Sequence, residues 1–317
     1  MISRTMQAAG FQTTGAGSKA ELLVAPAPAK KSGEMLVAVK FSVINPADLL
    51  VKSGAAKPMF ADAQPPYWGG LEFAGIVESA GADDLFPEGT QVAGVSHFAG
   101  TGRGAHAEFV AVPATSVCEV PEGMPLEVAA CVPMSGLTAM LAIDRMDAKA
   151  GDTIAVVGAA GSVGAFAVQI AAKRGIRMIA IVSEKDAGIA RSFGATDIVV
   201  RGANWVDDVR ALVPGGVKAL LDTALVGDAT LPAIADGGIM IALRGSHLPA
   251  DPPRSIKAVL VSVREYYERT DKLSELLEMV AAGPSPRIAE TFSAANANEA
   301  FTAAENNSVK GRVVLAF

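Results

Sequence analysis

Short apolar runs separated by glycine and proline fill the first third of the chain, and this pattern predicts a β-rich region. The candidate strands lie at residues 35–43, 74–80, 91–95 and 107–112. The pattern changes between Pro121 and Pro125, after which residues 126–141 are apolar at helical spacing. Because proline fits the first turn of a helix, we expect a helix over 126–141 and a domain boundary just before it.

From Gly151 onward the chain alternates strands and helices. Apolar runs of strand length lie at residues 153–157, 177–182, 197–200, 217–221, 239–243 and 258–263. Helical patterns lie at residues 163–174, 186–193 and 264–278, and a closing strand lies at 311–317. Nearly continuous Val, Ile and Ala strands that alternate with helices predict a parallel sheet covered on both faces. We therefore expect an α/β fold with a doubly wound sheet at residues 123–263 and a β-rich domain built from residues 1–122 and 264–317.

Composition excludes several classes of protein. The 317 residues are 50% hydrophobic and 19% charged, which excludes a disordered chain, and the formal charge of −6 argues against nucleic acid as a partner. Cys118 and Cys131 are too few for a disulfide scaffold and indicate a reducing, cytoplasmic compartment. The first 17 residues lack the apolar core of a signal peptide, and glycines interrupt the apolar stretch 153–172. We therefore expect neither secretion nor a membrane span.

The strongest local motif runs from Val157 to Gly164, with the sequence VGAAGSVG, between a predicted strand and a predicted helix. Small residues there let the backbone approach a pyrophosphate, and the helix N-terminus supplies amide donors and a positive dipole end. The alternative is a purely structural turn. The expected cofactor contacts in this turn are Gly158, Ala160, Gly161, Ser162, Val163 and Gly164.

The end of the second strand of the sheet indicates which dinucleotide binds. An acidic residue there holds the ribose diol of NAD, whereas a small polar residue with a nearby cation admits the 2′-phosphate of NADP. Ser183 takes the strand-end position, Lys185 follows it, and Arg201 closes the next strand. These residues favour NADP(H). Glu184 is the opposing residue, because its carboxylate facing the ribose would favour NAD, and Lys185 is alternatively a plain surface charge.

Several ordered motifs give the chain a resemblance to a known family over nearly its whole length. They are INPAD at 44–48, GLEFAG at 70–75, GAHAEF at 104–109, SGLTA at 135–139, GATD at 194–197, LD at 221–222 and GRVV at 311–314. Through these motifs, taken together and in this order, the chain resembles the zinc-independent quinone oxidoreductase branch of the medium-chain dehydrogenase/reductases. The resemblance implies a Rossmann cofactor domain and a GroES-like catalytic domain. It also implies a homodimer paired through the strand at 258–263.

The resemblance further assigns residues to the cofactor and the substrate. It places Asn45 beside the nicotinamide and the substrate, where the amide would donate to a carbonyl oxygen, and it adds Thr138, Leu243 and Arg312 to the cofactor contacts. Asp48 is a catalytic candidate whose alternative role is to orient its neighbours. Tyr67 is a candidate for lining the substrate cleft, and it is otherwise a packing aromatic. Substrate is expected to enter between the two domains.

A metal site is not expected. Zinc-dependent members of this superfamily carry a Cys before the early Asp and a Gly-His-Glu turn, and this chain has Asn45 and Leu71 at those places. The three histidines, His97, His106 and His247, and the two cysteines show no ligand spacing.

The predicted activity is zinc-free hydride transfer from NADPH to a small molecule, either a quinone or a conjugated enone or enal. The alternatives are enoyl-thioester reduction or zinc-free alcohol oxidation on the same fold, and a non-enzymatic NADPH-binding protein, since fold alone does not fix activity. Some enoyl-thioester reductases of this superfamily place a Tyr several residues after the early Asp, and residues 49–52 hold none.

Overall fold

The computed structural model describes residues 4–79, 85–306 and 310–317 of the chain. The chain divides into two compact units. Unit 1 comprises Met1–Met134 and Tyr267–Phe317, and unit 2 comprises Ser135–Tyr266. The domain boundaries expected from the sequence, at 122/123 and 263/264, stay a prediction. Along the parts of the chain that the structure describes, no helix is long and apolar enough to cross a membrane.

Unit 1 is rich in β-strands that come from both ends of the sequence. A hairpin pairs β1 (Thr5–Gly10) with β2 (Glu21–Pro26). A larger sheet has the order β14-β15-β3-β4-β5-β7, and β6 also pairs with β3. Its strands are β3 (Glu34–Ile44), β4 (Glu72–Ser79), β5 (Gln91–Val95), β6 (Phe109–Pro113), β7 (Val117–Glu119), β14 (Ile288–Ser293) and β15 (Arg312–Ala316).

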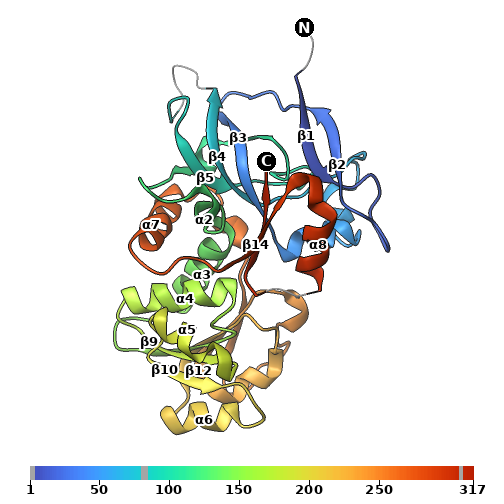
Figure 1. Ribbon diagram of the computed structural model, residues 1–317. Coiled ribbons are helices and arrows are strands. Elements are labelled where there is room, and N and C mark those ends of the chain that lie inside the picture. Colours follow the sequence, from blue (N-terminus) through green and yellow to red (C-terminus); the bar gives the residue numbers. More distant parts are fainter. Residues whose placement is uncertain (1–3, 80–84, 307–309) are drawn as a thin grey trace. The chain divides into compact units, whose positions relative to one another are not determined.

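The C-terminal strand β15 lies inside this sheet, between β14 and β3 (Figure 1). It runs antiparallel to β3, with Val314 opposite Val43. The apolar faces of β3, β4 and β6 enclose a core that includes Met35, Val37 and Phe73, all fully buried. The helices of this unit are α1 (Pro46–Lys52), α2 (Leu126–Ala130), the start of α3 (Pro133–Arg145), α7 (Thr270–Ala281) and α8 (Ala297–Glu305).

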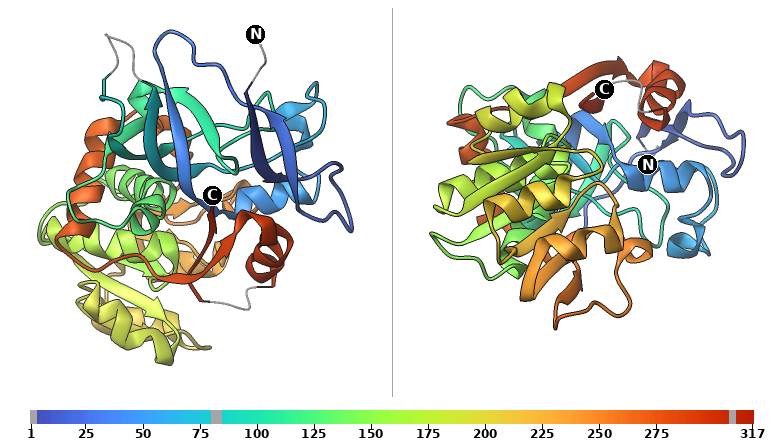
Figure 2. Two further views of the ribbon diagram at one scale, coloured as in Figure 1. Left: turned by 45° about the horizontal axis from the view of Figure 1, so that its top comes forward. Right: turned by 90° about the horizontal axis from the view of Figure 1, so that it is seen from below.

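Unit 2 is a parallel sheet with helices packed on it (Figure 2). The strand order is β10-β9-β8-β11-β12-β13, which is the 3-2-1-4-5-6 order of a Rossmann fold when the strands are counted along the chain. The strands are β8 (Thr153–Val157), β9 (Arg177–Val182), β10 (Asp197–Val200), β11 (Val217–Asp222), β12 (Ile234–Ala242) and β13 (Lys257–Leu260). The helices are α4 (Ser162–Lys173), α5 (Ala187–Ser192) and α6 (Trp205–Leu212). The predicted fold class, a doubly wound parallel sheet with a β-rich partner domain, is confirmed.

Two predicted helices are wrong in their bounds. The single helix expected over 126–141 is divided into α2 and α3, with Cys131 and Val132 between them, because Pro133 lacks an amide hydrogen and restricts the residue before it. The helix expected over 264–278 begins only at Thr270, after a short 3-10 turn at Val263–Tyr266, and runs to Ala281. The strand expected at 258–263 ends at Leu260. Ala80, the last residue of the strand expected at 74–80, lies outside the described residues.

Candidate functional site

The glycine-rich turn of unit 2 joins the carboxyl end of β8 to the N-terminus of α4. Gly158 has φ +83°, a left-handed conformation that favours glycine, and its amide donates to Ile181 O at 2.9 Å. A Cβ on Gly164 would lie 2.3 Å from Gly158 O, so the helix touches the turn backbone to backbone. Gly161, in contrast, has extended φ and ψ of −77° and 172°, and a Cβ there would meet only Gly158 O, at 3.2 Å.

The geometry of this turn fits a phosphate group. The first amides of α4 have no carbonyl of their own helix to bind, and they share the positive end of the helix dipole. Gly161 has no side chain, and apart from Gly158 O the space that a Cβ would occupy there is open. The turn lies between β8 and β11, where the strand order reverses and where ligands bind in open α/β sheets. The described residues therefore fit the pyrophosphate of a dinucleotide.

The other predicted cofactor residues of unit 2 follow the same edge of the sheet. Ser183, Arg201 and Leu243 come directly after the carboxyl ends of β9, β10 and β12, and Lys185 lies in the 3-10 turn η3 (Glu184–Asp186) that follows Ser183. Thr138 lies in α3 and is half-buried. Their contacts with a cofactor stay predictions.

Two residues hold the loop after β11: the sequence named Asp222 only as part of a family motif, without a role, and it gave no signal for Thr223. Thr223 donates to Val157 O at 2.7 Å, and its hydroxyl would be 2.5 Å from a Cβ on Gly158. Asp222 is buried and accepts hydrogen bonds from the amides of Ala224, Val226 and Gly227 at 2.7–3.0 Å. Its place at the end of a buried strand was the available signal, because a buried carboxylate needs donors nearby.

A cavity of about 390 Å³ opens at the opposite edge of the same sheet, beside the first residues of β8, β11 and β12. Its charged lining includes Lys218, which forms an ion pair with Asp152 at 2.6 Å. Ligands of open α/β sheets bind at the carboxyl ends of the strands, so this cavity is not where the dinucleotide is expected.

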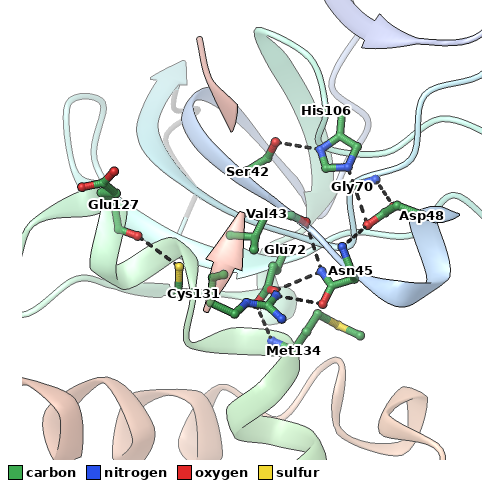
Figure 3. A network of polar contacts seen from close by, with 11 residues as sticks. Ser42, Val43, Asn45, Asp48, Gly70, Glu72, His106, Glu127, Cys131 and Met134 are labelled. Carbon is green, nitrogen blue, oxygen red and sulfur yellow. Dashed lines mark hydrogen bonds and ion pairs between the residues drawn. The ribbon is translucent and has the colours of Figure 1, made fainter. Parts of the chain in front are cut away.

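The polar residues of unit 1 form a buried network around Asn45 (Figure 3). The side-chain amide nitrogen of Asn45, Nδ2, donates to Glu72 Oε1 at 3.0 Å and to Val43 O at 3.1 Å. Arg312 Nη2 donates to the side-chain oxygen Asn45 Oδ1 at 2.9 Å. Both amide hydrogens of Asn45 are therefore in use. The predicted donation to a substrate carbonyl requires one of these bonds to be exchanged.

Glu72 is the centre of this network, although sequence reasoning did not single it out. It is fully buried, pairs with the Arg312 guanidinium, and accepts the amide hydrogen of Met134 at 2.8 Å. Burial raises the pKa of the Glu72 carboxyl, and the positive charge of Arg312 opposes that rise. Arg312, which the resemblance assigned to the cofactor, is itself buried and bound to Asn45 and Glu72.

Asp48 serves two backbone amides. Its carboxylate accepts from Asn45 N and from Gly70 N, both at 2.7 Å, and it is fully buried. His106 lies beside it, with Nε2 3.6 Å from Asp48 Oδ2 and Nδ1 2.7 Å from the Ser42 hydroxyl. This geometry favours the orienting role for Asp48, and a chemical role stays a prediction.

Tyr67 is buried and its hydroxyl is fully engaged. The hydroxyl donates to Ala63 O at 2.9 Å and accepts from Lys57 Nζ at 2.7 Å, and Lys57 Nζ also lies 4.4 Å from the centre of the ring. Lys57 was not recognised in the sequence. The pairing supports the packing alternative for Tyr67, while the predicted place in the substrate cleft stays untested. Along the described residues, no group of three or more His, Cys, Asp or Glu side chains has the geometry to hold a metal ion.

Both cysteines are expected to be unreactive in the folded chain. Burial raises the pKa of the Cys118 thiol to about 11 and that of Cys131 to about 12, from 9.0. At pH 8, alkylation of native protein by iodoacetamide should therefore be at least about 100-fold slower than in urea, because the thiolate is the nucleophile. Mass spectrometry of labelled protein measures the rate of alkylation, and equal rates with and without urea would contradict this expectation.

The raised pKa values of the two thiols also make the stability of the chain depend on pH. As the pH rises, the thiols ionise in the unfolded chain before they ionise in the folded chain. Their contribution to the free energy of unfolding is therefore fully present below pH 9 and is lost between pH 9 and pH 11–12.

Comparison with known proteins gives two family models and a set of relatives. The alcohol dehydrogenase GroES-like domain matches residues 31–122, and a zinc-binding dehydrogenase domain matches residues 193–315. The chain is 34% identical over 239 residues to a zinc-type alcohol dehydrogenase-like protein of Schizosaccharomyces pombe, covering 75% of this chain and 68% of that protein. It is 31% identical over 192 residues to a quinone oxidoreductase of Sus scrofa, covering 59% of this chain and 56% of the relative. The chain thus spans little more than half the length of that relative.

Solved structures of similar fold cover almost the whole chain. A mycobacterial protein determined in complex with NADPH is 27% identical and has a TM-score of 0.82, covering 98% of this chain and all of that one. A mycobacterial protein solved in its native form, with the same identity, TM-score and coverage, bears the name quinone oxidoreductase.

Proposed function

Because the chain belongs to the medium-chain dehydrogenase/reductase superfamily and is of the quinone oxidoreductase type, we propose that it transfers hydride from NADPH to a small electron-poor acceptor. The acceptor class is a quinone or a conjugated enone or enal. The observation that carries the proposal is the Gly158–Gly164 turn. It lies where the order of the strands in the sheet reverses, and it leaves the space beside Gly161 open for a pyrophosphate.

The bound nicotinamide would supply the hydride, and the chain's own residues bind and orient. The amides at the start of α4 would hold the pyrophosphate, and Ser183, Lys185 and Arg201 would hold the adenosine 2′-phosphate. Asn45 would orient the reacting groups after exchanging one of its present bonds. Glu72 and Arg312 keep that amide in one orientation, because each binds one side of it.

The proposed reaction uses no metal. Zinc-dependent relatives place ligands where this chain has Asn45 and Leu71. Asn45 carries a neutral amide that is not among the usual zinc ligands, and the Leu71 side chain has no ligand atom.

A turnover screen tests the proposal. NADPH and NADH are each offered with quinones, enals, enoyl thioesters and alcohols, before and after treatment with a zinc chelator. We expect chelation-resistant oxidation of NADPH by quinones or enals. Turnover restricted to thioesters or alcohols, or activity that is lost on chelation and restored by zinc, would overturn the proposal. Tight NADPH binding without any turnover would show a binding protein instead.

We also propose a homodimer formed through β13. This strand is one edge of the parallel sheet, and Leu260 at its end is 46% exposed. Uncovered edges pair readily with another chain. Light scattering at micromolar concentration should give a dimer mass, and Leu260→Lys should shift it toward monomer. The matched control is Val200→Lys, which places the same charge at a 48% exposed position on the other edge strand, β10, and should leave the dimer intact. A monomeric wild type would contradict the proposal.

A further inference from the structure

The end of β9 carries an acidic residue that competes for the group expected to hold a 2′-phosphate. Ser183 follows β9, and its hydroxyl donates to Asp186 Oδ2 at 2.5 Å. The Asp186 amide donates back to Ser183 O at 2.9 Å, so both residues belong to one tight turn. Asp186 is half-buried, whereas Glu184 and Lys185 between them are exposed.

The cations of this edge are placed next to the same serine. The Arg201 amide donates to Val182 O at 2.7 Å, which fixes Arg201 beside the residue that precedes Ser183. Arg201 and Lys185 are both exposed, and within the described ranges neither charged head forms an ion pair. Two cations are therefore available for an anionic ligand, while the serine hydroxyl is already donated to a carboxylate.

We propose that Asp186 is a specificity-determining residue for the cofactor, and that it restrains the preference for NADPH over NADH. The inference rests on the proposed function, since it concerns the same dinucleotide site. A serine hydroxyl has one hydrogen to donate, so it serves either Asp186 or the 2′-phosphate, but not both at once. The Asp186 carboxylate also repels the phosphate, whereas the ribose 2′-hydroxyl of NADH can donate to it.

This assignment separates Asp186 from Glu184, the acidic residue that the sequence made conspicuous. Glu184 is exposed and no hydrogen bond of its carboxylate is recorded along the described chain, so water screens its charge. Asp186 instead acts through the hydrogen bond that it accepts from the Ser183 hydroxyl, and Glu184 has no such bond. The chemistry predicts that the two carboxylates, two positions apart, have unequal effects on the cofactor ratio.

The test compares the ratio of kcat/KM for NADPH and NADH, together with the dissociation constant of each cofactor, in matched variants. Asp186→Ala should raise the NADPH to NADH ratio about tenfold or more, the effect of one charge-assisted hydrogen bond gained. Glu184→Ala removes the same charge from the same turn and should change the ratio less than about threefold. In a Ser183→Ala background, the gain from Asp186→Ala should shrink, because the hydroxyl that mediates it is missing.

Asp186→Asn provides a variant that keeps the size of the side chain and an acceptor for Ser183 while it removes the charge. It should give a smaller gain than alanine, since the hydroxyl stays engaged. Equal gains from Asp186→Ala and Glu184→Ala, or a ratio that Asp186→Ala leaves unchanged in protein that binds both cofactors, would overturn the inference alone. A wild type that binds neither cofactor would overturn the proposed function as well.

Discussion

Aspartate in place of Gly161 is expected to abolish useful NADPH binding while the chain stays folded. The backbone of Gly161 is extended, and its Cβ would meet only Gly158 O, at 3.2 Å, so the turn accommodates a side chain with a small shift. The new carboxylate would lie against the pyrophosphate, and juxtaposed like charges cost several kcal/mol. The dissociation constant should therefore rise by about 100-fold or more.

Two other substitutions serve as controls for this experiment. Gly161→Ala adds the Cβ without the charge and should weaken NADPH binding much less than Gly161→Asp does. Gly164→Ala should damage the fold itself, because its Cβ would lie 2.3 Å from Gly158 O and 2.7 Å from the Cα of Ala159. Fluorescence titration with NADPH measures binding, and circular dichroism verifies folding. Unchanged affinity in folded Gly161→Asp protein would refute the assignment of the turn.

Removal of the Arg312 side chain is expected to produce the largest loss of stability. Arg312→Ala leaves the fully buried Glu72 carboxylate without its counter-charge, and breaking a buried pair in this way costs roughly 3–5 kcal/mol. It also removes the donor to Asn45 Oδ1. Arg312→Ala should raise the pKa of Glu72 further, since the arginine charge is what opposes the effect of burial.

The position of the two tryptophans makes this loss measurable in unit 1 alone. Trp68 belongs to unit 1 and Trp205 to unit 2, and the chain has no others. In a Trp205→Phe background, urea unfolding followed by fluorescence therefore reports on unit 1. The double variant Glu72→Gln, Arg312→Met removes both charges of this buried pair and should be more stable than Arg312→Ala. A double variant less stable than the single one would contradict this explanation.

The sequence predicted the regular part of the fold well, because buried strands carry a clear signal. The apolar runs at 91–95, 153–157, 177–182 and 197–200 have the same bounds as β5, β8, β9 and β10. The sequence failed for β14, whose residues are half-buried or exposed along its whole length and therefore show no clear alternation. It also failed at Pro133, where an unbroken apolar pattern concealed a break between two helices.

The sequence suggested residues for the candidate site, which stay predictions, but it did not indicate how the buried polar residues pair. The glycine turn is local, so the pattern of a strand, glycines and a helix revealed it. Glu72 and Arg312 are 240 positions apart, and no pattern in one segment indicates a partner in the other. Ser183 and Asp186 are only three residues apart, yet the direction of a serine hydroxyl depends on a turn geometry that residue types alone do not determine.

The placement of β15 between β14 and β3 has a consequence for the nascent chain. Unit 2 is one continuous stretch, Ser135–Tyr266, whereas unit 1 receives β14 and β15 only after unit 2 has left the ribosome. At typical rates of translation, the 240 residues between Glu72 and Arg312 take on the order of 10–50 s to synthesise. During that interval Phe41–Ile44, the last residues of β3, lack their partner β15, and the Glu72 carboxylate has no counter-charge. Unit 1 therefore begins to be synthesised before unit 2 but is completed after it. A chaperone that protects the nascent chain would need to shield unit 1.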